Sequence, residues 1–129
     1  MNAETLFCSA VERRLCAPGS GVRVARINSG DAIITGRDGA TRVFRGAKRG
    51  TGDLAGYVVG EGWHLEVECK VDGAKQTSAQ RAREHALVAA GCVYVVVRLS
   101  TVDGLEQSVD RAASAVDAAI HARRHRAEA

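Results

Sequence analysis

Hydrophobic residues recur at helical spacing near both ends of the chain. The stripe near the N-terminus predicts a helix over residues 3 to 16 and consists of Leu6, Phe7, Ala10, Val11 and Leu15. Asn2 stands in the N-cap position of this helix, and Pro18 with the glycines beside it ends it. A second stripe predicts a C-terminal helix over about residues 102 to 125 and consists of Leu105, Val109, Ala112, Val116 and Ile120.

Strand-like runs follow the first helix. Residues 22–27, 32–35 and 41–44 are predicted as strands separated by turn signals, and the Gly-rich basic segment 46–52 is predicted as a loop. Residues 54–59 and 63–70 are two further strands, and the intervening Gly60-Glu61-Gly62 predicts that they form a hairpin.

A strand–helix–strand unit occupies residues 63 to 97. Residues 77–90 are predicted as a helix that ends at Gly91, and the continuously apolar run 92–97 indicates a strand buried on both faces. Two strands connected in this way form a right-handed crossover. We therefore expect one α/β domain over residues 1–129, with a mixed β-sheet flanked by helices.

Polar residues alternate with apolar ones along residues 63–70. One face of this strand carries Trp63, Leu65, Val67 and Cys69, and the other carries His64, Glu66, Glu68 and Lys70. Hairpin pairing would bring Asp53, at the start of the preceding strand, close to Glu68 and Lys70. Carboxylates gathered in this way repel one another unless a cation lies between them, and oxygen ligands suit Mg²⁺ or Mn²⁺. The alternative interpretation is a hairpin with a solvated polar face.

Composition places the chain among ordinary globular proteins. Of its 129 residues, 46% are hydrophobic and 26% charged, and the formal net charge is +3. No apolar run approaches the roughly 18 to 20 residues of a membrane span, and the N-terminus has no secretion-signal pattern. The four cysteines form no CxxC pair, so we expect free thiols in a reducing cytoplasm.

The order Asp53, then Glu68-Cys69-Lys70 on a strand, resembles the signature of the PD-(D/E)xK nuclease superfamily, although Gly52 stands where that signature has Pro. The surrounding segments, over about residues 4–98, look like the VRR-NUC family, particularly its short stand-alone phage-type members. The segments that carry this resemblance are Arg26–Gly30, Gly50–Leu54, Glu66–Lys70, Gly73, Thr77–Gln80 and Gly91. The resemblance implies a restriction-endonuclease-like core with the order αβββαβα.

The resemblance also implies a role for particular residues. Asp53 and Glu68 would bind Mg²⁺ or Mn²⁺ together with the backbone carbonyl of Cys69, and Glu4 on the first helix would complete the metal site. Lys70 would orient the attacking water or stabilise the developing phosphorane charge. Gln80 matches the family's Gln on the helix after the motif strand.

Several of these residues have a second interpretation. Thr77 and Gln80 also form a capping box, and Glu4 is also a first-turn acid favoured by the helix dipole. Glu66 shares the face of Glu68 and is a reserve ligand. The four histidines are expected at the surface.

The function implied by the resemblance is a metal-dependent DNA endonuclease acting on structured or branched DNA, such as Holliday junctions or flaps. It implies a homodimer in the cytoplasm of a bacterial host or phage-infected cell, with no membrane association. Basic residues flanking the site would hold DNA phosphates, and these are Arg26, Lys48, Arg49 and Lys75. Two alternatives stay open: a catalytically silent nucleic-acid-binding module with the nuclease fold, and a small α/β protein with no nucleic-acid role.

Overall fold

A computed structural model describes residues 2–27, 32–35, 37, 39–44 and 52–128. Every helix and strand predicted from the hydrophobic pattern is present, with ends that differ by a few residues. In chain order the elements are α1 (Ala3–Leu15), β1 (Val22–Arg26), β2 (Ala32–Thr35), β3 (Thr41–Phe44), β4 (Leu54–Val58), β5 (His64–Val71), α2 (Ser78–Ala89), β6 (Val93–Leu99) and α3 (Leu105–Glu128).

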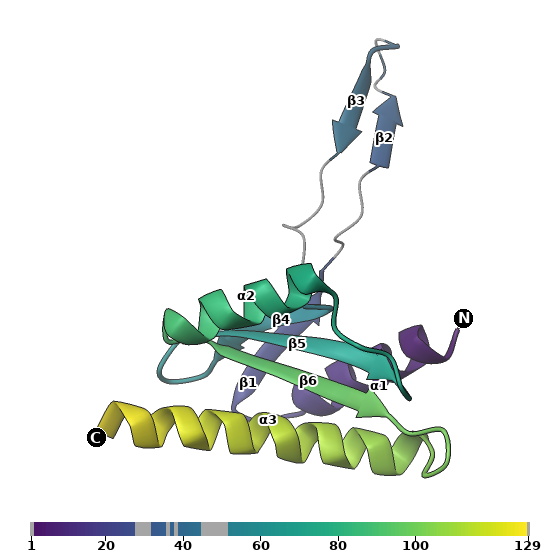
Figure 1. Ribbon diagram of the computed structural model, residues 1–129. Helices are drawn as coiled ribbons and strands as arrows, with labels where there is room; N and C mark the ends of the chain where they lie inside the picture. Colours follow the sequence, from purple (N-terminus) through teal and green to yellow (C-terminus); the bar gives the residue numbers. More distant parts are fainter. Residues whose placement is uncertain (1, 28–31, 36, 38, 45–51, 129) are drawn as a thin grey trace.

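Four of the strands form a mixed sheet in the order β1-β4-β5-β6 (Figure 1). β1 and β4 pair antiparallel, and β4 and β5 form the predicted antiparallel hairpin. β5 and β6 pair parallel, and α2 connects them along the chain. β2 and β3 pair with each other in a separate two-stranded sheet, inserted between β1 and β4. Without this insertion, the helices and the main strands follow the expected order αβββαβα.

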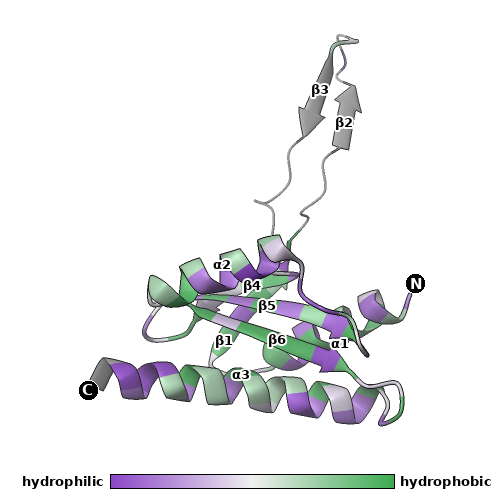
Figure 2. Ribbon diagram, in the orientation of Figure 1, coloured by the Kyte–Doolittle hydropathy of each residue, from purple (hydrophilic) through white to green (hydrophobic). Residues whose placement is uncertain are grey.

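The apolar core lies between one face of the sheet and the helices α1 and α3, which cover that face together (Figure 1). Alternating residues of β4 and β5, among them Leu54, Val58, Leu65 and Val67, are buried in it. Hydrophilic and hydrophobic residues alternate along β5 (Figure 2). The helices contribute their predicted stripes, namely Phe7, Val11 and Leu15 from α1, and Ala112, Val116 and Ile120 from α3. Across the described ranges, no helix combines the length and the apolar character needed to span a membrane.

The opposite face of the sheet has a different character, because the layer beneath α2 is polar. Glu66 and Glu68 of β5 and Tyr94 of β6 are all buried there, whereas no residue of α2 is fully buried. The prediction that residues 92–97 are buried on both faces is confirmed at Tyr94, which is 6% exposed, whereas Val96 on the same face is half-buried. Polar contacts, rather than an extensive apolar interface, therefore seat α2 on the sheet.

β1 approaches β4 very closely at Gly56. A Cβ atom at this position would lie 1.8 Å from the carbonyl oxygen of Arg23, which is far inside van der Waals contact. Gly56 pairs with Val24 in the ladder between the two strands. The sequence requires glycine here because the two backbones leave no room for a side chain.

The four cysteines are free thiols, as expected. Cys8 and Cys69 are buried, and Cys16 and Cys92 are half-buried. The thiols of Cys8 on α1 and Cys69 on β5 are hydrogen-bonded to each other, which lowers the pKa of Cys8 and, with burial, raises that of Cys69. This contact joins α1 to the strand that carries Glu68 and Lys70.

Candidate active site

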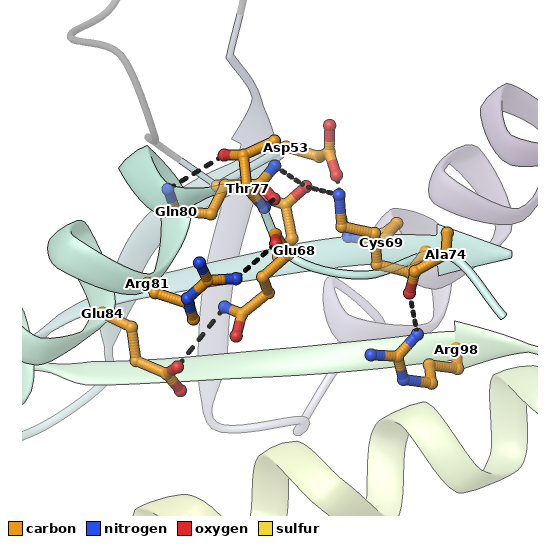
Figure 3. Close-up of polar contacts among 12 residues, drawn as sticks. Asp53, Glu68, Cys69, Ala74, Thr77, Gln80, Arg81, Glu84 and Arg98 are labelled. Atoms are coloured by element: carbon orange, nitrogen blue, oxygen red, sulfur yellow. Dashed lines mark hydrogen bonds and ion pairs between the residues drawn. The ribbon is translucent and has the colours of Figure 1, made fainter.

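Four elements meet at one end of the main sheet. β1 ends there at Arg26, β4 begins there after Asp53, and the second half of β5 carries Glu68 and Lys70. The first turn of α2 lies above β5, so that Gln80 faces the same point (Figure 3). The hairpin β2–β3 is inserted into the chain between Arg26 and Asp53, at this same end.

Asp53 is joined to both neighbouring strands. Its side-chain Oδ2 accepts a hydrogen bond of 2.7 Å from the backbone N–H of Cys69, and its backbone carbonyl accepts one of 2.9 Å from the N–H of Ile27. The last residue pair of the β4–β5 ladder is Leu54 with Val67, so Cys69 lies beyond the end of that ladder. The predicted approach of Asp53 to the Glu-x-Lys triplet is confirmed.

Glu68 lies at the centre of the group and is only 3% exposed. Its Oε1 accepts a hydrogen bond of 2.9 Å from the Gln80 amide and lies 3.8 Å from the Lys70 ammonium nitrogen. Its Oε2 lies 3.4 Å from the Tyr94 hydroxyl, which donates to it. Each of these three neighbours is a donor, so the surroundings of Glu68 suit an ionised carboxylate.

Even so, the pKa of Glu68 is raised to about 8. Burial is the largest cause, and the charge of Asp53 together with a hydrogen bond between the two carboxyl groups raises the pKa further. Lys70 and Tyr94 act in the opposite direction without compensating. Glu68 therefore keeps its proton near neutral pH, and a bound cation would displace that proton.

Gln80 has both of the functions that the sequence left open. The side-chain Oε1 of Gln80 accepts a hydrogen bond of 2.8 Å from the backbone N–H of Thr77. The backbone N–H of Gln80 donates one of 3.1 Å to the Thr77 hydroxyl, which completes the capping box. Its side-chain Nε2 remains available and donates to Glu68. The same side chain thus starts α2 and fixes the orientation of the central carboxylate.

Glu66 is not available as a reserve ligand, and this interpretation is corrected. Its side chain is fully buried and both oxygens are occupied, by Arg83 at 2.7 Å, His64 at 2.6 Å and the Gly52 N–H at 2.9 Å. Burial acts to raise the pKa of Glu66, but these hydrogen bonds outweigh it and hold the pKa below its ordinary value.

Glu4 stands apart from the other predicted site residues. It is exposed in the first turn of α1, one turn before Cys8, and it has no side-chain hydrogen bond or ion pair with another described residue. Among the residues that the structure describes, no three His, Cys, Asp or Glu side chains converge as metal ligands. The described site therefore offers two carboxylates, Asp53 and Glu68, which the backbone carbonyl of Cys69 can supplement.

Two of the four predicted DNA-contacting residues lie in the described part of the chain. Arg26 is exposed at the end of β1, opposite Leu54 in the ladder, and Lys75 is exposed in the loop before α2. Arg98 donates at 2.5 Å to the carbonyl of Ala74 and so fixes this loop beside the sheet (Figure 3). Lys48 and Arg49 lie outside the described residues.

Comparison of the sequence with family models and with curated proteins identifies no relative. No protein-family model matches the chain, and no curated protein is recognisably similar to it in sequence. The site must accordingly be judged on its own geometry.

Two residues of the site were not singled out from the sequence. Tyr94 lies in the strand predicted to be buried, yet its hydroxyl contacts Glu68, and Arg83 belongs to none of the sequence motifs, yet it contacts Glu66. A hydroxyl within an otherwise apolar strand was a signal for the first. The signal for Arg83 was its place three residues after Gln80, which puts both on one face of α2.

Proposed function

We propose that this protein is a metal-dependent nuclease of the VRR-NUC type, with a restriction-endonuclease-like core, that hydrolyses phosphodiester bonds in DNA. The observation that carries the proposal is the contact between the carboxyl groups of Asp53 and Glu68, with the Lys70 ammonium 3.8 Å from Glu68. This arrangement stands beyond the last residue pair of the β4–β5 ladder, where β5 still pairs with β6 but no longer with β4.

The donor chemistry supports Mg²⁺ or Mn²⁺. Asp53 and Glu68 offer carboxylate oxygens, which these cations prefer. In a strand, the N–H and C=O of one residue point to the same side, so the Cys69 carbonyl is expected on the side where the Cys69 N–H meets Asp53. With so few protein ligands, water and the DNA phosphate would complete the coordination of the cation.

Each residue then has a separable role in hydrolysis. A bound divalent cation would lower the pKa of the attacking water and neutralise charge on the scissile phosphate. Lys70, whose side chain is 12% exposed, is placed to donate to the attacking water or to a phosphate oxygen. Gln80 keeps Glu68 aimed at the site, and Tyr94 holds the other oxygen of the same carboxylate.

Branched or otherwise structured DNA is the proposed substrate, and a homodimer is the proposed active form. A domain of this size has little surface beyond the site with which to recognise a second DNA arm. A second copy of the chain would supply that surface. Arg26, exposed at the end of β1, and Lys75, exposed in the loop before α2, are suited to phosphates of the bound strand.

Cleavage of a panel of DNA shapes tests this proposal. Junction, flap and linear duplexes are incubated with protein in Mg²⁺, Mn²⁺ or EDTA, beside the Lys70→Ala variant. We expect metal-dependent cleavage by the wild-type protein that the variant loses by a factor of about 100 or more, as for loss of a charge-stabilising group. Cleavage in EDTA, or equal cleavage by the variant, would contradict the proposal.

One observation favours the catalytically silent alternative. Glu4 is exposed in the first turn of α1 and makes no side-chain hydrogen bond or ion pair with the described site residues, so among those residues it does not join Asp53 and Glu68. Tight DNA binding by a protein that shows no Mn²⁺ binding in calorimetry would support that second reading.

A further inference from the structure

Glu66 is a fully buried carboxylate two residues before Glu68, on the same face of β5. Arg83 of α2 reaches it with two hydrogen bonds, from Nη2 to Oε2 at 2.7 Å and from Nε to Oε1 at 3.3 Å. A buried ion pair contributes little net stability, because removing both charges from water offsets their attraction. Its presence directly behind the candidate site therefore calls for an explanation other than stability.

The third partner of Glu66 points to that explanation. The backbone N–H of Gly52 donates to Oε1 of Glu66 at 2.9 Å, in a buried position, and Gly52 directly precedes Asp53. A Cβ atom at position 52 would lie 3.0 Å from the Val67 carbonyl oxygen and 3.2 Å from the Glu66 Cβ. Gly52 thus lies directly against the backbone of β5, and the Glu66 carboxylate holds it there.

Two hydrogen bonds from backbone to side chain join β5 to the start of β4, and each segment supplies one of the accepting carboxylates. The Glu66 side chain accepts from the backbone before Asp53, and the Asp53 side chain accepts from the backbone after Glu68. Between them lies the pair Leu54 with Val67, at which the β4–β5 ladder ends. These bonds continue the alignment of the two segments past the point where strand pairing stops.

We propose that Glu66 is a positioning residue, which fixes Asp53 against Glu68 by holding the Gly52 amide, and that Arg83 balances the buried charge of Glu66. This inference rests on the proposed nuclease function. Arg83 lies one turn after Gln80 on α2, and the two side chains contact Glu66 and Glu68 respectively. The polar side chains between β5 and α2 thus position both proposed metal ligands, Asp53 and Glu68.

Two double variants separate positioning from the charge of the pair. In both, Arg83→Met removes the cation. Glu66→Gln keeps an oxygen that accepts from Gly52 and offers its amide hydrogens to His64, whereas Glu66→Met has the same length and no strong acceptor. Arg123→Met is the control, because Arg123 is another half-buried arginine, bonded to the Gly91 carbonyl and stacked on Trp63, away from the site.

The measurements are Mn²⁺ affinity by calorimetry, kcat and KM for DNA cleavage, and hydrogen exchange of the segment around Gly52 and Asp53. Each is made where circular dichroism shows the variant to be folded. We expect the Glu66→Met/Arg83→Met variant to bind Mn²⁺ about 10- to 100-fold more weakly and to lose kcat rather than KM, as for loss of a group that orients a ligand. Exchange at Gly52 should become faster.

The Glu66→Gln/Arg83→Met variant and Arg123→Met should stay within a few-fold of wild type. Unchanged Mn²⁺ affinity and exchange in the Met double variant would overturn the inference, as would equal losses in the Gln and Met double variants. If the wild-type protein cleaves DNA and binds Mn²⁺ in these cases, only the positioning role fails. If the wild-type protein does neither, the proposed function itself fails.

Discussion

The side chain of Asp53 accepts a 2.7 Å hydrogen bond from the backbone of Cys69, 16 residues further along the chain. This bond closes the end of the β4–β5 hairpin and brings Asp53 against the buried carboxyl group of Glu68. Burial and the charge of Asp53 make ionisation of Glu68 unfavourable in the metal-free protein. A strongly raised carboxyl pKa is typical of ligand-binding centres, and the stability lost when Glu68 ionises can be measured.

The first prediction concerns pH and stability. The pKa of Glu68 is about 8 in the folded protein and near 4.5 when unfolded, so the folded state keeps a proton that the unfolded state releases between these values. The contribution of Glu68 to stability is full below pH 4.5 and is lost as pH rises to 8, at up to about 1.4 kcal/mol per pH unit. Glu68→Gln, which cannot ionise, should match wild type near pH 5 and exceed it by about 2 kcal/mol or more at pH 8.5.

Urea unfolding in EDTA at the two pH values measures this difference. Saturating Mn²⁺ should stabilise the wild-type protein and leave Glu68→Gln nearly unaffected. Glu106→Gln, on the exposed first turn of α3, is the matched control and should show neither effect. A Glu68→Gln protein less stable than wild type at pH 8.5 would show that the carboxyl contact is not destabilising.

A second prediction separates the two functions of Gln80. Thr77→Ala removes the acceptor for the Gln80 N–H and should cost about 1 kcal/mol of stability while leaving cleavage within a few-fold of wild type. Gln80→Ala removes the donor to Glu68 as well and should lower kcat by about tenfold or more. Thermal unfolding and single-turnover cleavage of both variants provide the test. Equal loss of activity in the two would mean that Gln80 acts only through the helix cap.

The third prediction addresses the contact between β1 and β4. Gly56→Ala would place a Cβ atom 1.8 Å from the Arg23 carbonyl oxygen, so the strands must separate. We expect a loss of about 3 kcal/mol or more, a large part of the stability of a small domain. Ala25→Ser, at an exposed position of β1, is the control and should be nearly neutral. Chemical denaturation of the two variants gives the comparison.

A fourth prediction concerns binding to DNA. Arg26→Ala and Lys75→Ala should each weaken DNA binding and reduce the slope of log K against log salt by about one, because each removes one phosphate contact. Arg111→Ala is the control, because Arg111 lies on α3, across the sheet from α2, where it pairs with Asp103. Fluorescence anisotropy at several salt concentrations measures the slopes. Loss of affinity only in Arg111→Ala would assign DNA to the other face.

The hydrophobic pattern was sufficient to predict the architecture. Stripes at helical spacing predicted α1 and α3, and the strict alternation of residues 63–70 predicted which face of β5 bears Glu68 and Lys70. Turn signals predicted the β4–β5 hairpin, which brings Asp53 into the site. These features depend on local spacing alone, so one sequence is enough to reveal them.

The polar layer under α2 could not be predicted in the same way. Glu66 and Glu68 occupy equivalent positions in the alternation, and only the three-dimensional packing shows that Arg83 and Gly52 occupy the first while the second faces Asp53. Likewise, the spacing of apolar residues in α1 places Glu4 near the edge of the buried face, but it does not specify the distance of Glu4 from the other carboxylates. Contacts between elements depend on how the elements pack, which periodicity does not specify.

The most direct test of the central claim is the rate of DNA cleavage by the wild-type protein and by Asp53→Asn as Mn²⁺ is titrated. Asn keeps the size of Asp53 and an oxygen that can accept from Cys69, but it removes the charge that the cation requires. The account predicts cleavage by the wild-type protein that rises with Mn²⁺ and saturates, and a loss of about 100-fold or more in Asp53→Asn. Cleavage that does not depend on Mn²⁺, or that is equal in the two proteins, would contradict it.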